Sequence, residues 1–276
     1  MRWPWTASGG RVVVLVYHRV FEPPQDPQLL CVHPARFAEH LEHLRTFTVL
    51  RLRELDFAHL PERGVAVTFD DGYLDNLQFA KPSLQKYGVP ATVFAATGST
   101  GTDREFWWDE LERIAPPSRY EQLHRQIRQS TASQREAILA PLRHGEHRAD
   151  YRPMRPVELK QLIDDGLVDI GSHGVTHTAF TALTTDERQR EIVDSKRALE
   201  TWLGRRVDTF AYPFGGKRDV PPSAIAAVRS ADYHLACANF RKPVTAKTNP
   251  FLVPRFVVRN WPGEEFARQL QGFFNG

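Results

Sequence analysis

Short apolar runs alternate with segments of helical periodicity along most of the chain. Runs such as "RVVVLVYH" and "VAVTFDD" are apolar until their last residues, which is typical of buried strands. We expect strands at residues 11–18, 65–71, 90–97, 167–174, 207–215, 233–238 and 251–259.

The segments between these runs carry apolar residues at helical spacing. The longest helix is expected at residues 184–204, where Thr184 or Thr185 would cap the start and Gly204 would end it. The other helices are expected at residues 33–47, 75–88, 156–166, 221–231 and 263–274. This alternation predicts an α/β fold with parallel strands, arranged as a barrel or as a doubly wound sheet.

Residues 99–155 break the alternation. The segment is polar and rich in Arg and Gln, and "FWWDEL" stands near its start at residues 106–111. We interpret it as an insertion on the rim of the fold, so residues 1–276 are expected to form a single domain.

Composition narrows the class of protein only slightly. Apolar residues at 41% and charged residues at 25% are ordinary for a globular chain of 276 residues. A net charge of +3 without a basic run predicts no nucleic-acid partner. Two cysteines, Cys31 and Cys237, do not indicate a disulfide and favour a reducing compartment.

The N-terminal region contains the apolar run "VVVLVY", which is shorter than the core of a usual signal peptide. No stretch approaches the about 20 apolar residues of a transmembrane helix. We therefore expect no transmembrane segment and a cytoplasmic location, and the sequence carries no signal for the oligomeric state.

Polar residues gather where the expected strands end. Asp70 and Asp71 end one strand, His18 ends the first, "GSHGVTH" contributes His173 and His177, and "AYPFGG" ends another. Active sites of parallel α/β folds form at the carboxyl ends of the strands. Four strands with polar ends therefore predict a site.

Two histidines and a carboxylate are a common set of metal ligands. A helical turn after His173 would let His173 and His177 converge, and Asp71 would complete the set. A divalent cation would compensate the charge of Asp71 and leave Asp70 to act as a base toward water. This would explain two adjacent carboxylates after a buried strand, which are costly without compensation.

Each feature alone has a structural explanation. An isolated His-x-x-x-His is often a surface or helix-cap pair, and Asp-Asp-Gly is often a turn. A histidine after a strand, such as His18, is commonly structural, and the tryptophans of "FWWDEL" could anchor the insertion in place of stacking on a sugar. Their joint occurrence at strand ends favours a site.

The motifs "TFDDG", "SHGVTH" and "YPFGG", in this order, resemble the polysaccharide deacetylase family (NodB-homology domain, carbohydrate esterase family 4). The segments "LVYHRV", "HPARFAEHLEHL" and "VLRLREL" resemble its poly-N-acetylglucosamine deacetylase subgroup. The resemblance covers about residues 11–260. It implies a distorted (β/α)7 barrel and a divalent metal, most often Zn²⁺, with Co²⁺ and Ni²⁺ as alternatives.

The resemblance also implies roles for individual residues. Asp71, His173 and His177 would be the metal ligands, and Asp70 would be the general base. The turn at Tyr212, Pro213 and Phe214 would contact the acetyl group, with the backbone N–H of Phe214 as an oxyanion donor.

Two departures from the family pattern stand out. The arginine that usually precedes the Pro-aromatic turn is replaced by Phe210, Ala211 and Tyr212, and Arg255 in "VPRF" is our candidate substitute. The usual late Leu-x-His is also missing. In the subgroup, the histidine of the opening "YH" strand takes that role, so we assign the general acid to His18, with His234 as the alternative.

These observations predict a metal-dependent hydrolase that removes the N-acetyl group from an amino sugar. The sugar would be linked to a nucleotide, a lipid or a small molecule, or be part of an oligosaccharide, with Trp108 or Trp107 beside it. The alternatives are a non-catalytic carbohydrate-binding relative, and an esterase or amidase of the same family that acts on a non-sugar substrate.

Overall fold

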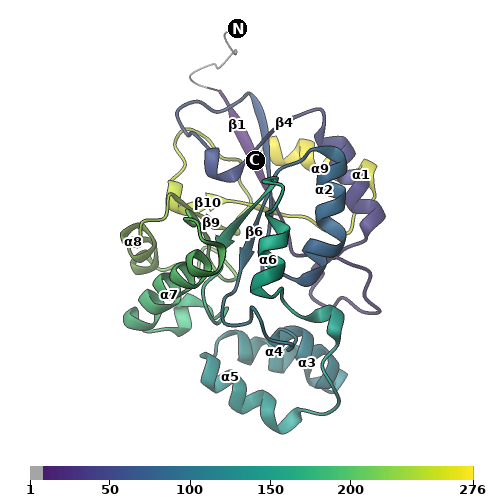
Figure 1. Cartoon of the computed structure of the whole chain (residues 1–276), viewed down its shortest axis with the longest axis vertical. Helices are drawn as coiled ribbons and strands as arrows, with labels where there is room; N and C mark the ends of the chain where they lie inside the picture. Colours follow the sequence, from purple (N-terminus) through teal and green to yellow (C-terminus); the bar gives the residue numbers. More distant parts are fainter. Residues whose placement is uncertain (1–8, 276) are drawn as a thin grey trace.

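Parallel strands form a nearly closed barrel in the computed structural model of the chain, which describes residues 9–275 (Figure 1). The strands of the barrel are β1 (Arg11–Tyr17), β4 (Thr48–Leu50), β5 (Arg63–Phe69), β6 (Ala91–Ala95), β7 (Val168–Ser172), β8 (Thr209–Ala211), β9 (Leu235–Ala238), β10 (Val253–Pro254) and β11 (Phe256–Val257). Their order is β10-β9-β8-β7-β6-β5-β1-β11, with β4 also paired to β5. The predicted barrel is confirmed.

The barrel is brought close to closure by residues 253–257. In this segment β10 pairs with β9, where Val253 lies opposite Cys237, and β11 pairs with β1, where Phe256 lies opposite Leu15. The prediction of a single strand at residues 251–259 is therefore wrong, because the region contains two short strands. The segment changes its pairing partner from β9 to β1, the strands at the two edges of the sheet. The change occurs at Arg255, which lies between β10 and β11.

The apolar strands fill both faces of the barrel wall. Along β1, Val12 and Val14 belong to the apolar cluster inside the barrel, while Val13 and Leu15 pack toward the surrounding helices. Alternation in a strand places successive side chains on opposite faces, so a run that is apolar throughout is buried on both. The packed interior leaves the strand ends as the place for polar groups.

Helices cover the outside of the barrel (Figure 1). They are α1 (Pro34–Leu44), α2 (Lys81–Tyr87), α6 (Pro156–Leu162), α7 (Thr185–Leu203), α8 (Pro222–Ser230) and α9 (Gly263–Asn275). Thr184 caps α7 through a capping box with Glu187, and Gly204 ends it in the left-handed conformation with φ of 67°. The helix expected at residues 75–88 begins instead with a π-helical turn, Asn76–Ala80. No helix within residues 9–275 combines the length and the apolar character needed to cross a bilayer.

Residues 99–155 lie between β6 and β7, two strands that pair directly with each other. The segment contains α3 (Trp107–Ile114), α4 (Tyr120–Arg128) and α5 (Ala132–Leu139), which lie together at one end of the molecule (Figure 1). These helices share an apolar cluster that reaches the barrel at Tyr73 and Ala96.

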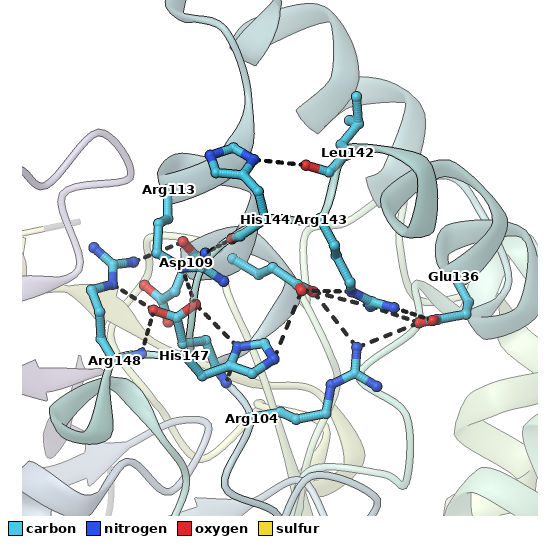
Figure 2. A network of polar contacts seen from close by, with 11 residues as sticks. Arg104, Asp109, Arg113, Glu136, Leu142, Arg143, His144, His147 and Arg148 are labelled. Atoms are coloured by element: carbon cyan, nitrogen blue, oxygen red, sulfur yellow. Dashed lines mark hydrogen bonds and ion pairs between the residues drawn. The ribbon is translucent and has the colours of Figure 1, made fainter.

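Ion pairs hold the insertion together (Figure 2). Arg143 binds Glu110 of α3 at 2.7 Å and also binds Glu136 of α5. Arg148 binds Glu112 at 2.7 Å, so the chain that returns to the barrel is fixed against α3. Helix α4 is held differently, because its Leu123 and Ile127 pack into the apolar cluster of the insertion.

Candidate metal and active site

A group of three buried side chains converges at the carboxyl end of the barrel. Asp71 follows β5, His173 follows β7, and His177 lies four residues later. Nε2 of His177 lies 3.2 Å from Oδ1 of Asp71, and Nε2 of His173 lies 3.6 Å from the same oxygen. One ligand atom of each residue lies within 4.8 Å of the others, so the three can share one metal ion.

The two histidines converge through an irregular loop, and the helical turn expected after His173 is absent from residues 173–178. Glu191 of α7 holds this loop, because its Oε2 accepts hydrogen bonds from the N–H groups of Val175 at 2.7 Å and Thr176 at 2.9 Å. His177 then adopts a φ of 51°, an uncommon conformation for a residue other than glycine. The two imidazoles therefore converge as expected, but the expected helical turn between them is wrong.

The side-chain atoms of Asp71, His173 and His177 have the protonation and hydrogen-bonding states that a bound cation requires. Nδ1 of His173 lies 2.7 Å from the carbonyl of Ala211, so it carries the proton and leaves the Nε2 lone pair facing Asp71. Oδ1 of Asp71 and Nδ1 of His177 are buried without a hydrogen-bond partner among the described residues. Burial lowers the pKa of His173, lowers the pKa of His177 to about 3 and raises the pKa of Asp71. Neutral imidazoles beside an unpartnered carboxyl group fit a bound divalent metal.

Beside this group, Asp70 forms a two-pronged ion pair with Arg255. Nη1 and Nη2 of Arg255 donate to Oδ1 and Oδ2 of Asp70, each at 2.7 Å, and both side chains are buried. Burial by itself would raise the pKa of Asp70, but the guanidinium of Arg255 holds the pKa down at about 2. Asp70 is therefore a carboxylate at neutral pH, with its plane fixed by the arginine.

Arg255 also connects Asp70 to the turn after β8. Its Nε donates to Oδ1 of Asn239 at 3.0 Å, and Nδ2 of Asn239 donates to the carbonyl of Phe214 at 2.9 Å. Phe214 has a φ of 63°, and its N–H donates no backbone or side-chain hydrogen bond within residues 9–275. The turn therefore offers a free donor near the buried carboxylates.

These groups form the floor of a cleft of about 250 Å³. Among the residues proposed from the sequence, the lining includes His18, Asp70, Asp71, Trp107, Trp108, His173, His177 and Phe214. Trp108 packs with its ring centroid 4.7 Å from that of His177, and its indole N–H donates to the hydroxyl of Tyr73 at 2.6 Å. It is at once an anchor of the insertion and a wall of the cleft.

Four of the proposed residues lie outside the lining. Arg255 is buried behind Asp70, and Pro213 belongs to the turn but does not line the cleft. Tyr212, expected to contact substrate, is buried in the core, where its hydroxyl donates to the carbonyl of Phe251. His234, the alternative acid, is exposed just before β9, at the opposite end of that strand from the site. Alternation along β8 places Ala211 inward and Tyr212 outward, which excludes the expected contact.

Other residues that line the cleft were missed. They are Gln28, Leu30, His124, Arg128, Asn239, Val257 and Arg259. Asn239 directly follows β9, so the strand-end argument that identified Asp70 would also have identified it. His124 and Arg128 lie on α4, and no sequence pattern indicates which face of an inserted helix meets the barrel.

Comparison with known proteins yields a consistent set of relatives. A model of the family described as polysaccharide deacetylase matches residues 58–236. The poly-beta-1,6-N-acetyl-D-glucosamine N-deacetylase of Staphylococcus aureus (strain MSSA476) is 20% identical, over 95% of this chain and 83% of that protein. YxkH of Bacillus subtilis (strain 168), which is named after the same family, is 23% identical over 77% of this chain, and the match spans 60% of YxkH.

Solved structures share the fold. The Streptococcus pyogenes deacetylase PplD, solved in complex with acetate, superposes with a TM-score of 0.69 at 18% identity, over 95% of this chain and 99% of PplD. IcaB from Ammonifex degensii gives a TM-score of 0.65 at 20% identity, over 96% of this chain and 98% of IcaB. At such identities the likeness shows a common barrel.

Metal binding can be tested without any assumption about the reaction. His177→Ala removes one of three ligands, so the affinity for Zn²⁺ should fall more than about tenfold, at least the scale seen when a supporting partner of a ligand is lost. The measurement is equilibrium dialysis against Zn²⁺ with metal analysis. His234→Ala, at an exposed position away from the cleft, is the matched control and should bind like the parent protein. Full metal binding by His177→Ala would show that the ion is held elsewhere.

Proposed function

Because the chain belongs to the polysaccharide deacetylase family, we propose that it hydrolyses the N-acetyl amide of an amino sugar with the help of a divalent cation. The observation that carries the proposal is the Asp71, His173 and His177 group beside the Asp70–Arg255 pair, on the floor of one cleft. The name of the Staphylococcus aureus relative, a poly-N-acetylglucosamine N-deacetylase, supports an amino-sugar amide as the substrate.

Asp71, His173 and His177 would hold the cation. When bound, it would act as a Lewis acid that polarises the acetyl carbonyl and makes a water molecule acidic enough for a weak base to deprotonate. The side chains of the protein then have three tasks: to accept the proton of the water, to stabilise the oxyanion, and to protonate the leaving amine.

Asp70 is suited to the first task. Its pKa of about 2 keeps it ionised throughout the physiological range, and its two bonds to Arg255 fix the carboxylate while leaving one lone pair on each oxygen. Nε2 of His173 lies 3.8 Å from Oδ2, which places the carboxylate beside the ligand group. In this arrangement Arg255 performs the orienting role that the family assigns to the arginine missing before residue 213.

Phe214 is suited to the second task. Its N–H has no hydrogen-bond partner within residues 9–275, and Asn239 holds the carbonyl of the same residue. A fixed backbone donor aimed at developing charge is worth about 3–4 kcal/mol in enzymes with an oxyanion hole. Phe214 itself lines the cleft and has a left-handed φ of 63°.

His18 is suited to the third task. It follows β1, lines the cleft, and is half-buried. Burial lowers the pKa of His18, and the carboxylates of Asp71 and Asp70 oppose this shift only in part. An amine is a poor leaving group unless it is protonated. An imidazolium at the position of His18 supplies that proton.

Asp70→Asn tests the base. The variant should keep its metal and lose at least about a hundredfold in kcat for acetate release from an N-acetylated sugar, the scale of general base catalysis. Asp164→Asn, an exposed carboxylate paired with Lys81, is the control and should retain full activity. If Asp70→Asn loses its metal, Asp70 is a ligand and the proposed division between the two aspartates is wrong.

His18→Ala tests the acid. Hydrolysis of the sugar amide should fall strongly, whereas hydrolysis of nitrophenyl acetate should be spared, because a nitrophenolate leaves without protonation. The two rates are compared in metal-loaded protein. An equal fall for both substrates would show that His18 supports the site in another way than as a proton donor.

A further inference from the structure

The floor and the wall of the cleft carry charges of opposite sign: carboxylates lie on the floor and arginines lie in the wall. Asp70 and Asp71 are the only carboxylates among the described residues that line it, and both lie on the floor. Arg255 balances Asp70 through two hydrogen bonds of 2.7 Å. Under the proposed function the cation more than balances Asp71. The floor therefore leaves no net negative charge to face a substrate.

In the described part of the chain, two arginines lie in the wall of the cleft, and only Arg128 has a carboxylate partner. Nη2 of Arg128 lies 2.9 Å from Oδ2 of Asp219, and its guanidinium carbon lies 4.7 Å from the centre of the Phe214 ring. The charge of Arg128 is thus paired with Asp219, and the face of its guanidinium packs on Phe214.

Arg259 has no such partner among residues 9–275. No carboxylate within residues 9–275 lies within 4.0 Å of its guanidinium nitrogens. Nη1 donates to the carbonyls of Gln28 and Leu29, while Nε and Nη2 form no hydrogen bond with the described part of the chain. Burial lowers the pKa of Arg259, and the charge of Asp26 opposes this shift. The two carboxylate oxygens of Asp26 accept the N–H groups of Leu30 and Cys31, each at 2.9 Å. Arg259 therefore lines the cleft with two guanidinium nitrogens, Nε and Nη2, that are free to bind an anionic ligand.

Strand pairing places Arg259 on the side of His18. β11 lies beside β1, with Val257 opposite Val16, and the N–H of Val258 donates to the carbonyl of Val16 at 3.0 Å. Val257 and Arg259 both line the cleft, as residues two apart on one face of an extended chain do. Under the proposed function His18 protonates the leaving amine of the sugar, so an arginine on the side of His18 lies toward the sugar.

We propose that Arg259 makes the cleft selective for an N-acetylated amino sugar that carries an anionic oxygen group, phosphate or carboxylate, on or next to the sugar ring. The proposal rests on the proposed function. A guanidinium presents its donors as a fork that matches two oxygens of either anion. A cleft of about 250 Å³ is smaller than the roughly 300–1,000 Å³ of sites for drug-sized ligands, which favours one sugar with a small substituent.

The test compares three substrates in metal-loaded protein: a neutral methyl glycoside of N-acetylglucosamine, N-acetylglucosamine 1-phosphate, and N-acetylmuramic acid. The parent protein should show kcat/KM at least about tenfold higher for an anionic sugar than for the neutral one, the scale of a hydrogen bond to a charged group. Arg259→Gln should abolish most of this ratio, and Arg259→Lys should keep part of it. Arg125→Gln, on the exposed face of α4, is the matched control and should leave the ratio unchanged.

A second measurement separates this proposal from the proposed function. Calorimetric titration of the same sugars into Asp70→Asn measures affinity without turnover. Tighter binding of an anionic sugar that Arg259→Gln removes in the same background supports the proposal, even if no substrate releases acetate. Equal affinity and equal kcat/KM for neutral and anionic sugars, or a preference that survives Arg259→Gln, would overturn it. A preference for one anion alone identifies the group as phosphate or as carboxylate.

Discussion

The ion pair between Arg255 and Asp70 joins the segment that closes the barrel to the strand end that bears the site. Both side chains are almost fully buried, so water solvates their charges poorly and each charge depends on the other. Arg255 stands where the chain passes from β10 to β11, between the two edges of the sheet. The same residue therefore fixes the seam of the barrel, the plane of Asp70 and, through Asn239, the turn at Phe214.

Much of this arrangement follows from the order of residues alone. Apolar runs that end in Asp, His or a Pro-Phe turn place polar groups at the ends of parallel strands, and parallel strands bring their carboxyl ends together. That argument was sufficient for Asp70, Asp71, His173 and His18, all of which line one cleft. The beginning and end of α7 were equally readable, because a capping threonine and a left-handed glycine have local causes.

What could not be predicted depends on contacts between distant segments. The break of the last strand at Arg255 arises from the need to pair with two different edges, and the outward direction of Tyr212 arises from the register of β8. The loop of His177 takes its shape from Glu191, a residue in another helix. Arg128 and His124 reach the cleft because α4 packs into the apolar cluster of the insertion and Arg128 pairs with Asp219. The residues on the floor of the cleft can thus be predicted from local sequence motifs, whereas the residues of the wall depend on tertiary packing.

The free energy of unfolding of Asp70→Asn, Arg255→Met and the double variant, measured by denaturant titration with a chelator present, tests the dependence on this ion pair most directly. Each single change leaves one buried charge or its donors without a partner, and loss of a partner in a buried pair typically costs about 3–5 kcal/mol. The double variant should lose less than the sum of the single losses, by at least about 1 kcal/mol, since it removes both charges together. Losses that add within about 0.5 kcal/mol would show that the two residues stabilise the fold independently, and would contradict the account.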